Sequence, residues 1–197
     1  MFISLEGIDG SGKTTQAKLL AAELGENTVL VREPGSTQLG ERIRELLLDP
    51  ALTLAPMVEL QLFCAARTQL LDEVIRPALD QDIDVVCDRF SDSSVAYQGG
   101  GRGLGVADVR NLCDIVTERL WPDLTLLLKI DPAKARLSRN RPDRFEDEGL
   151  EFARAVAAAY EEIAAAEPDR VKVIDGQGSV RQVHARVMEA VGERAHS

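Results

Sequence analysis

Cysteine and long apolar runs are scarce in this chain of 197 residues. The three cysteines, Cys64, Cys87 and Cys113, are odd in number and no two are spaced C-x-x-C. This pattern argues against a disulfide framework and indicates reduced, buried thiols of a cytoplasmic protein. No apolar stretch reaches the length of a membrane span, and the first residues do not resemble a signal peptide. We therefore expect a cytoplasmic protein with no membrane partner.

Basic charge is also in deficit. The chain has 23 Lys and Arg against 33 Asp and Glu, a formal net charge of −10. Nucleic acids and membrane surfaces are anionic, so this balance argues against general binding to either. A substrate that carries phosphate would need locally concentrated cations, which makes the arginine clusters of the chain informative.

Short apolar runs alternate with helical patterns along the whole sequence, without an internal repeat or a linker between domains. This order predicts one α/β domain spanning 1–197, with a five-stranded, mostly parallel sheet and helices on both faces. Ligands of such sheets bind beyond the carboxyl ends of the strands. The expected strands are 2–5, 28–31, 84–87, 124–130 and 171–174, and the expected helices are 14–24, 39–48, 56–79, 106–119, 149–166 and 180–191. We expect Pro77 to break or end the third helix and 99–105, rich in glycine, to be a flexible connector.

The most specific motif comes directly after the first expected strand. Residues 7–14 read G-x-x-x-x-G-K-T and precede a helix, which is the context that a phosphate-binding loop requires. The glycines let backbone N–H groups converge on phosphate oxygens, and the helix N-terminus adds its positive dipole end. Lys13 would reach the β- and γ-phosphates, and the Thr14 hydroxyl would bind Mg²⁺. The alternative is an ordinary glycine-rich turn between strand and helix.

Two further strand ends carry polar side chains. Asp88 and Arg89 follow the third strand, where the carboxylate can orient Mg²⁺ and the guanidinium can clamp a phosphate. Arg32 follows the second strand, and Arg44 lies on the next helix, so both could approach a second anionic group. The simpler interpretations are a helix-capping Asp88 and solvated arginines.

Two further patterns that contain arginine indicate a site for a nucleotide base and a lid over the phosphates. Phe63 and Arg67 are four residues apart on one helix, so the ring could stack on a base while the guanidinium bonds its carbonyl edge. A core phenylalanine is the alternative. Arginines crowd a short segment from Arg136 to Arg144, which is typical of a lid that closes over transferring phosphates. A solvated helix end with internal ion pairs is the competing interpretation.

Taken in order, these motifs resemble those of bacterial thymidylate kinases. The similarity extends over nearly the whole chain and includes Asp9 within the phosphate loop, 32–35 (R-E-P-G), Phe63-x-x-x-Arg67, 88–98 (DRFSDSSVAYQ) and 143–146 (D-R-F-E). The resemblance implies in-line transfer of the γ-phosphoryl group from Mg-ATP to dTMP, giving dTDP for dTTP biosynthesis. It also implies a homodimer, and no nucleic acid or membrane partner.

The family roles transfer position by position. Phe63 would stack on thymine, Tyr97 would lie against the sugar, and Arg89 would hold the monophosphate. The implied catalytic residues are Lys13, Asp9, Arg89, Arg139, Arg141 and Arg144, the last three in a lid at about 136–149. ATP would contact Gly7, Ile8, Asp9, Gly10, Ser11, Gly12, Lys13, Thr14 and Thr15. For dTMP the implied contacts are Asp9, Arg32, Pro34, Arg44, Phe63, Arg67, Arg89, Ser94, Tyr97 and Gln98, and for Mg²⁺ Thr14, Asp9 and Asp88.

Gly10 stands where some family members place a catalytic arginine, so the lid would supply that cation here.

Three other functions remain open from the sequence. A deoxynucleoside kinase would need a carboxylate base, for which Glu33 or Asp9 could serve. Another nucleoside monophosphate kinase would differ at Phe63, Arg67 and Gln98. A nucleotide-binding switch would bind without turnover, although no Asn-Lys-x-Asp guanine motif is present.

Overall fold

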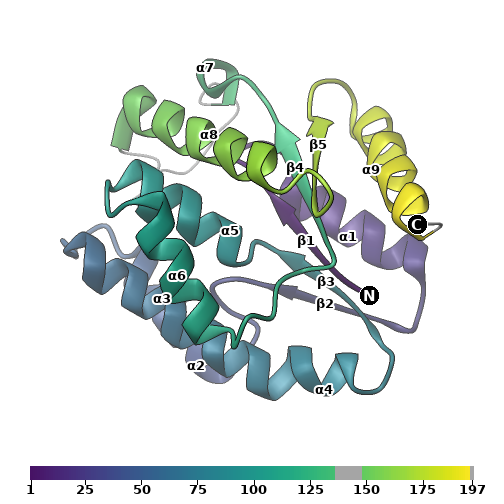
Figure 1. Cartoon of the computed structure of the whole chain (residues 1–197), viewed down its shortest axis with the longest axis horizontal. Coiled ribbons are helices and arrows are strands. Elements are labelled where there is room, and N and C mark those ends of the chain that lie inside the picture. The colour runs from purple at the N-terminus through teal and green to yellow at the C-terminus, as the bar shows by residue number, and fades with distance from the viewer. Residues whose placement is uncertain (136–147, 196–197) are drawn as a thin grey trace.

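Five parallel strands form the centre of the computed structural model, which describes residues 1–135 and 148–195 (Figure 1). The strands lie in the order β2-β3-β1-β4-β5. All five segments predicted from the sequence are strands in the structure, and every neighbouring pair is parallel. The strands are β1 (Phe2–Glu6), β2 (Thr28–Arg32), β3 (Asp84–Asp88), β4 (Leu124–Lys129) and β5 (Val171–Asp175).

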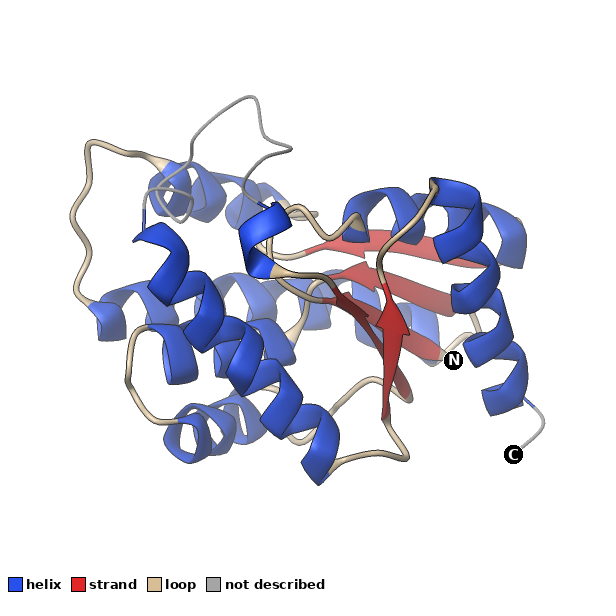
Figure 2. Ribbon diagram, turned by 90° about the horizontal axis from the view of Figure 1, so that it is seen from above, coloured by secondary structure: helices blue, strands red, loops and turns tan. Residues whose placement is uncertain are grey.

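Helices cover both faces of this sheet (Figure 2). On one face, Leu20 and Val187 pack against Leu126 and Ile174 of the strands. On the other face, Leu71 and Val85 belong to a second cluster of buried apolar side chains. Apolar side chains of the strands are therefore buried on both faces of the sheet. The first face carries α1 (Lys13–Leu24) and α9 (Val180–Ala195). The remaining helices are α2 (Gln38–Leu48), α3 (Pro56–Leu70), α4 (Arg76–Leu79), α5 (Ser91–Ser94), α6 (Val106–Val116), α7 (Pro132–Ala135) and α8 (Gly149–Ala166).

Pro77 was expected to break or end the helix at 56–79. The helical chain does end at Leu79, two residues after Pro77, but it is not broken at the proline, because it stays helical from Pro56 to Leu79. Residues Leu71–Ile75 form a π-helical turn, η1, and α4 continues directly from it. Pro77 lies at the first turn of α4, where a missing N–H costs least. The wider i→i+5 turn before it changes the hydrogen-bond ladder, so that the helix passes through the proline.

The flexible connector expected at 99–105 is also wrong for its first three glycines. They belong to a second π-helical segment, η2 (Val95–Gly101), which packs on α6 and α8. A Cβ at Gly100 would lie 2.5 Å from the side chain of Ala159, and one at Gly101 would lie 2.6 Å from the ring of Phe152. Glycine is therefore required here for close packing of helices.

The order of the strands changes sides at β1: β3 and β2 lie on one side of it, and β4 and β5 lie on the other, while all five strands run in the same direction. A crevice at such a switch point, beyond the carboxyl ends of the strands, is where sheets of this kind bind ligands.

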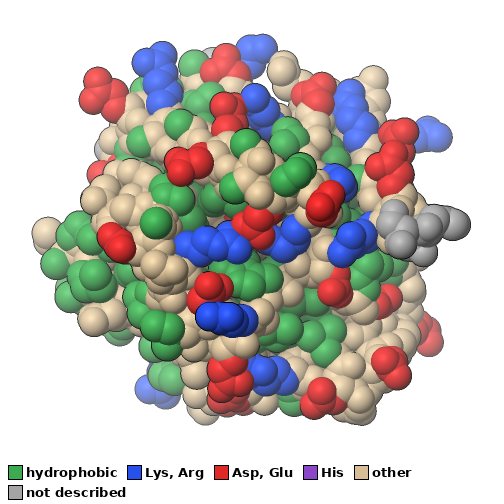
Figure 3. All heavy atoms as spheres, in the orientation of Figure 1, with side chains coloured by type: hydrophobic (Ala, Val, Ile, Leu, Met, Phe, Trp, Pro, Cys, Tyr) green, Lys and Arg blue, Asp and Glu red, His purple; other side chains and the backbone are tan. Residues whose placement is uncertain are grey.

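Within the described residues, no helix has both the length and the apolar character needed to cross a membrane. On the face drawn in Figure 3, acidic and basic side chains are interspersed among apolar ones.

Candidate active site

The loop between β1 and α1 has the backbone shape of a phosphate cradle. Gly10 and Gly12 adopt φ angles of 79° and 91°, a region that side chains disfavour. Lys13 begins α1, and its Nζ donates to the carbonyl oxygen of Ile8 at 2.8 Å. Burial, and then the charge of Arg89, lower the pKa of Lys13 well below its ordinary value. An anion bound within the loop would offset that cost.

A cavity of about 520 Å³ opens at this loop. The Thr14 hydroxyl donates to Asp88 Oδ2 at 2.5 Å across it, which places two hard oxygen ligands beside the loop. This pair fits Mg²⁺, which commonly takes one or two protein oxygens and completes its shell with phosphate oxygens and water. The cavity is lined by Asp9, Gly10, Gly12, Lys13, Thr14, Thr15, Arg32, Glu33, Arg44, Asp88 and Arg89.

A second, narrower pocket of about 100 Å³ adjoins the first. The two share Asp9, Glu33, Arg44 and Arg89, so they form one continuous cleft with a common wall of mixed charge. Most residues that the sequence assigned to the nucleotide base and sugar lie in the second pocket. Its lining is Asp9, Glu33, Pro34, Arg44, Leu48, Phe63, Arg89, Ser93, Ser94, Tyr97 and Gln98.

Arg89 stands at the junction of the two pockets. Its backbone has a φ of 73°, which is unusual for a residue with a side chain and is typical of functional sites. The guanidinium pairs with Asp9, and it donates to Tyr97 Oη at 3.1 Å and to the carbonyl oxygen of Gly7 at 3.1 Å. Arg89 is therefore fixed between the loop and the second pocket, as a phosphate clamp requires.

Sequence reasoning missed the buried carboxylate behind Arg89. Glu6 accepts hydrogen bonds from Ser93 Oγ at 2.6 Å and from Tyr160 Oη at 2.7 Å, and both hydroxyls also contact Arg89. Burial, followed by the charge of Asp92, raises the pKa of Glu6 to about 7. The only signal in the sequence is an acidic residue at the end of an apolar strand.

Arg67 lies in the wall of the second pocket rather than on its surface, since only 1% of it is exposed. Its Nε donates to Glu33 Oε2 at 2.8 Å, and its NH2 donates to Ser94 Oγ at 3.0 Å. NH1 contacts Cys113 Sγ at 3.6 Å, which leaves one NH1 hydrogen without a partner among the described residues. The pairing of Arg67 with Glu33 was not predicted from the sequence.

The two arginines of the second strand and helix differ in position. Arg44 lines both pockets, and its NH1 donates to the carbonyl oxygen of Pro34 at 3.1 Å. Arg32 lines the loop cavity but not the second pocket, and its guanidinium pairs with the Glu41 carboxylate at 2.6 Å. Arg139, Arg141 and Arg144, like Arg136, lie outside the described residues.

A third cavity, of about 620 Å³, also borders the loop. Gly7 and Ile8 line it, together with the ends of β4 and β5 and the side chains of Tyr160, Asp175 and Gln177. No motif in the sequence marks this cavity, because much of its lining is apolar.

Comparisons with known proteins agree on one family. The family model described as "Thymidylate kinase" matches residues 5–187. A thymidylate kinase of Deinococcus radiodurans is 45% identical over 100% of this chain and 98% of its own length, and one of a Synechococcus species is 48% identical over 98% and 96%. The crystal structure of a thymidylate kinase from Ehrlichia chaffeensis superposes with a TM-score of 0.82 at 38% identity, covering 98% of both chains.

Proposed function

This chain belongs to the thymidylate kinase family, and we propose that it transfers the γ-phosphoryl group of ATP to dTMP, giving dTDP in dTTP biosynthesis. The observation that carries the proposal is the continuous cleft, in which the loop cavity and the second pocket share Asp9, Glu33, Arg44 and Arg89. A triphosphate at the loop and a monophosphate at Arg89 would meet end to end there.

The acceptor is already an anion at neutral pH, so the transfer needs no general base. Catalysis then depends on alignment and on neutralisation of charge. Lys13 would leave its contact with the carbonyl oxygen of Ile8 to reach the phosphates, and Arg89 would hold the acceptor phosphate. Mg²⁺ near Thr14 and Asp88, with Asp9 close by, would neutralise charge on the phosphate oxygens.

The second pocket would hold the nucleoside of dTMP. Phe63 lines it and offers a ring for stacking, and Ser94 and Gln98 offer hydrogen-bonding groups. Tyr97 lies beside Arg89, where its ring would contact the sugar and favour deoxyribose. Arg67 would act from behind this wall, through its remaining NH1 hydrogen.

We propose that 136–149 serve as a lid within a single domain of residues 1–197. Since Gly10 provides no cation in the loop, Arg139, Arg141 and Arg144 are the candidates to stabilise the transferring phosphoryl group. Substituting each by Ala in turn would identify the one that lowers kcat without changing the KM for dTMP.

A deoxynucleoside kinase is less well supported by the geometry. Its carboxylate base would be Glu33 or Asp9, and these side chains pair with Arg67 and Arg89 respectively. A coupled assay of ADP release decides between the two functions. We expect turnover with dTMP and Mg-ATP, and turnover with thymidine alone would support the rival.

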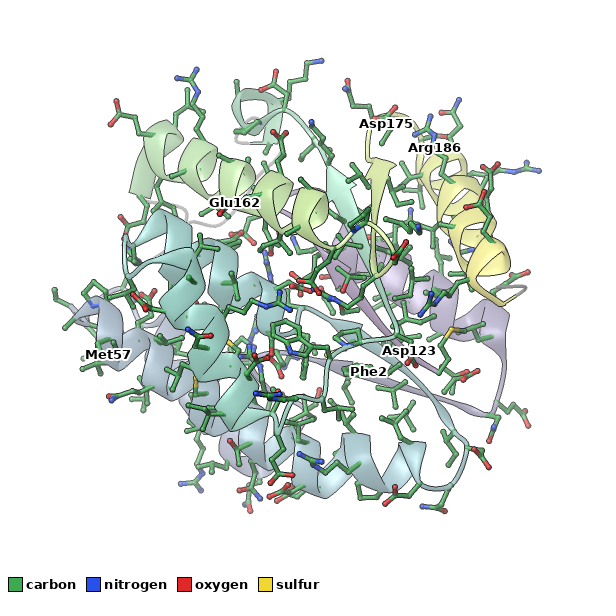
Figure 4. All side chains as sticks on the ribbon, in the orientation of Figure 1. Phe2, Met57, Asp123, Glu162, Asp175 and Arg186 are labelled. Atoms are coloured by element: carbon green, nitrogen blue, oxygen red, sulfur yellow. The ribbon has the colours of Figure 1, made fainter. Side chains whose placement is uncertain are left out.

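We further propose that the chain forms a homodimer in the cytoplasm. Exposed apolar side chains include Leu46 on α2, Met57 on α3 and Ile115 on α6, and α3 packs against both of the other two helices. Figure 4 shows Met57 at the outer edge of the molecule. The three cysteines are free and buried, which suits a reducing compartment. Light scattering should give twice the 21.5 kDa mass of the chain.

A further inference from the structure

We infer that Glu59, a residue with no assigned role, sets the base preference of this chain by fixing which end of the Gln98 amide faces the second pocket. The inference rests on the proposed function and deepens it, because it states how the pocket distinguishes one pyrimidine from another. Glu59 does not touch the pocket itself, so it would act as a positioning residue.

Three hydrogen bonds hold the Glu59 carboxylate. Gln98 Nε2 donates to Oε1 at 2.9 Å, and Arg102 donates to the same oxygen through Nε and to Oε2 through NH2, both at 3.1 Å. Glu59 is fully buried at the first turn of α3, whereas Gln98 and Arg102 belong to η2 and the residue after it. The contacts therefore join two helices that are adjacent in space and distant in the sequence.

This arrangement determines the orientation of the Gln98 amide. A carboxylate paired with arginine accepts hydrogen bonds and donates none, so it can face only the nitrogen end of the amide. The reverse orientation would bring two acceptor oxygens together in a buried site. Gln98 lines the second pocket, and no donor among the described residues reaches its Oε1. The oxygen end of the amide is thus the end available to a ligand.

Arg102 is itself held in place, which makes the orientation firm. It lies over the ring of Phe152 at 4.9 Å and pairs with Glu148 as well as with Glu59. Burial lowers the pKa of Arg102, but its hydrogen bonds to Glu59 and Glu148 outweigh this and raise it. Arg102 therefore stays positively charged beside the Glu59 carboxylate.

An acceptor oxygen in the pocket selects for a base with an N–H group at the matching position. Thymine and uracil carry hydrogen on N3, whereas cytosine presents a lone pair there. A site built around one such hydrogen bond rejects analogues that lack the hydrogen, because its own polar group is left unpaired. The chemical class read by Gln98 is therefore a 4-oxopyrimidine.

The test compares the ratio of kcat/KM for dTMP over dCMP in three proteins. Glu59→Met removes the acceptor and frees the Gln98 amide to turn. Glu148→Gln is the matched control, since it weakens the other partner of Arg102 without touching Gln98. We expect a wild-type ratio above roughly 10³, a fall of at least about tenfold in Glu59→Met, and little change in Glu148→Gln.

The outcomes separate this inference from the proposed function. If wild-type protein does not phosphorylate dTMP, the proposed function fails. If Glu59→Met is active but keeps the wild-type ratio, Glu59 has only a structural role and the inference alone is overturned. An equal fall in Glu148→Gln would also overturn it, because the effect would then belong to Arg102.

A measurement on the wild type covers the case in which Glu59→Met does not fold. dTMP methylated at N3 lacks the hydrogen that Gln98 Oε1 would accept. We expect this analogue to be at least roughly 100-fold poorer than dTMP. Equal use of the two acceptors would overturn the inference.

Discussion

Removing Arg67 should destabilise the protein and impair dTMP recognition by separate routes. Arg67 and Glu33 form a buried ion pair, with NH2 and Oε2 2.7 Å apart and exposed side-chain fractions of 1% and 4%. Glu33 Oε1 already has no hydrogen-bond partner among the described residues. Burial raises the pKa of Glu33, and the charge of Arg67 opposes that rise. Arg67→Met would therefore leave a buried carboxylate uncompensated.

The expected loss is about 3–5 kcal/mol in the free energy of unfolding, the usual cost of breaking one side of a buried pair. This is a large part of the ~5–15 kcal/mol that stabilises a typical domain. The double variant Arg67→Met/Glu33→Gln removes both charges and should recover most of the loss. Arg32→Met is a control for stability, because its pair with Glu41 is half exposed and should contribute about 0–1 kcal/mol.

Urea unfolding gives the stabilities, and a coupled assay of ADP release gives the KM values. We expect both Arg67 variants to raise the KM for dTMP roughly 10- to 100-fold while the KM for ATP changes little. A loss of under about 1 kcal/mol in Arg67→Met would refute the reasoning on burial. Equal increases in the two KM values would show that Arg67 does not serve the base pocket.

Three further predictions concern the loop and the carboxylates around it. Lys13→Ala should lower kcat/KM at least roughly 100-fold, as removal of a preorganised charge does, and near-normal turnover in steady-state kinetics would contradict its role. The contribution of Glu6 to stability should fall by about 3 kcal/mol as pH rises from 4.5 to 7, because burial keeps Glu6 protonated in the folded state up to about pH 7 while the unfolded chain ionises near 4.5. Urea unfolding at pH 5 and 7.5 should show a loss of stability in the wild type that is larger than the loss in Glu6→Gln; the same change with pH in both proteins would argue against Glu6. Asp88→Asn should raise the Mg²⁺ concentration needed for half-maximal activity several-fold, and an unchanged magnesium titration would place the ion elsewhere.

The sequence predicted the sheet well because its strands are apolar along their length. A strand buried on both faces gives a continuous run, as in Val85–Cys87, which periodicity detects without knowledge of tertiary contacts. The loop at 7–14 was equally accessible, since its glycines, lysine and threonine follow one another in the chain. Local signals of this kind do not depend on how distant segments pack.

The two π-helical segments could not be predicted in the same way. Their i→i+5 bonds have no separate signature in the pattern of apolar residues. The helix was expected to break or end at Pro77 because proline disrupts a regular α-helix, and the sequence does not show that a π-helical turn precedes it. The glycines at 99–101 resembled a loop in composition, yet they allow η2 to approach α8. Packing overruled local preference in both cases.

The supporting carboxylates of the site were missed for a different reason. Glu6 meets Tyr160 across 154 positions of sequence, Glu33 meets Arg67 across 34, and Glu59 meets Gln98 across 39. In the sequence, nothing distinguishes these three glutamates from the other acidic residues of the chain. Only the fold shows which arginine or hydroxyl it holds, and thus how the side chains at the pocket surface are oriented.

The most direct test of the account is the turnover of purified protein with Mg-ATP and a panel of acceptors: dTMP, dUMP, thymidine, dCMP and AMP. The account predicts dTMP-dependent formation of ADP and dTDP in equal amounts, with thymidine, dCMP and AMP far poorer. If dTMP remains unphosphorylated while ATP and magnesium are present, the central claim of two phosphate sites joined at Arg89 is contradicted.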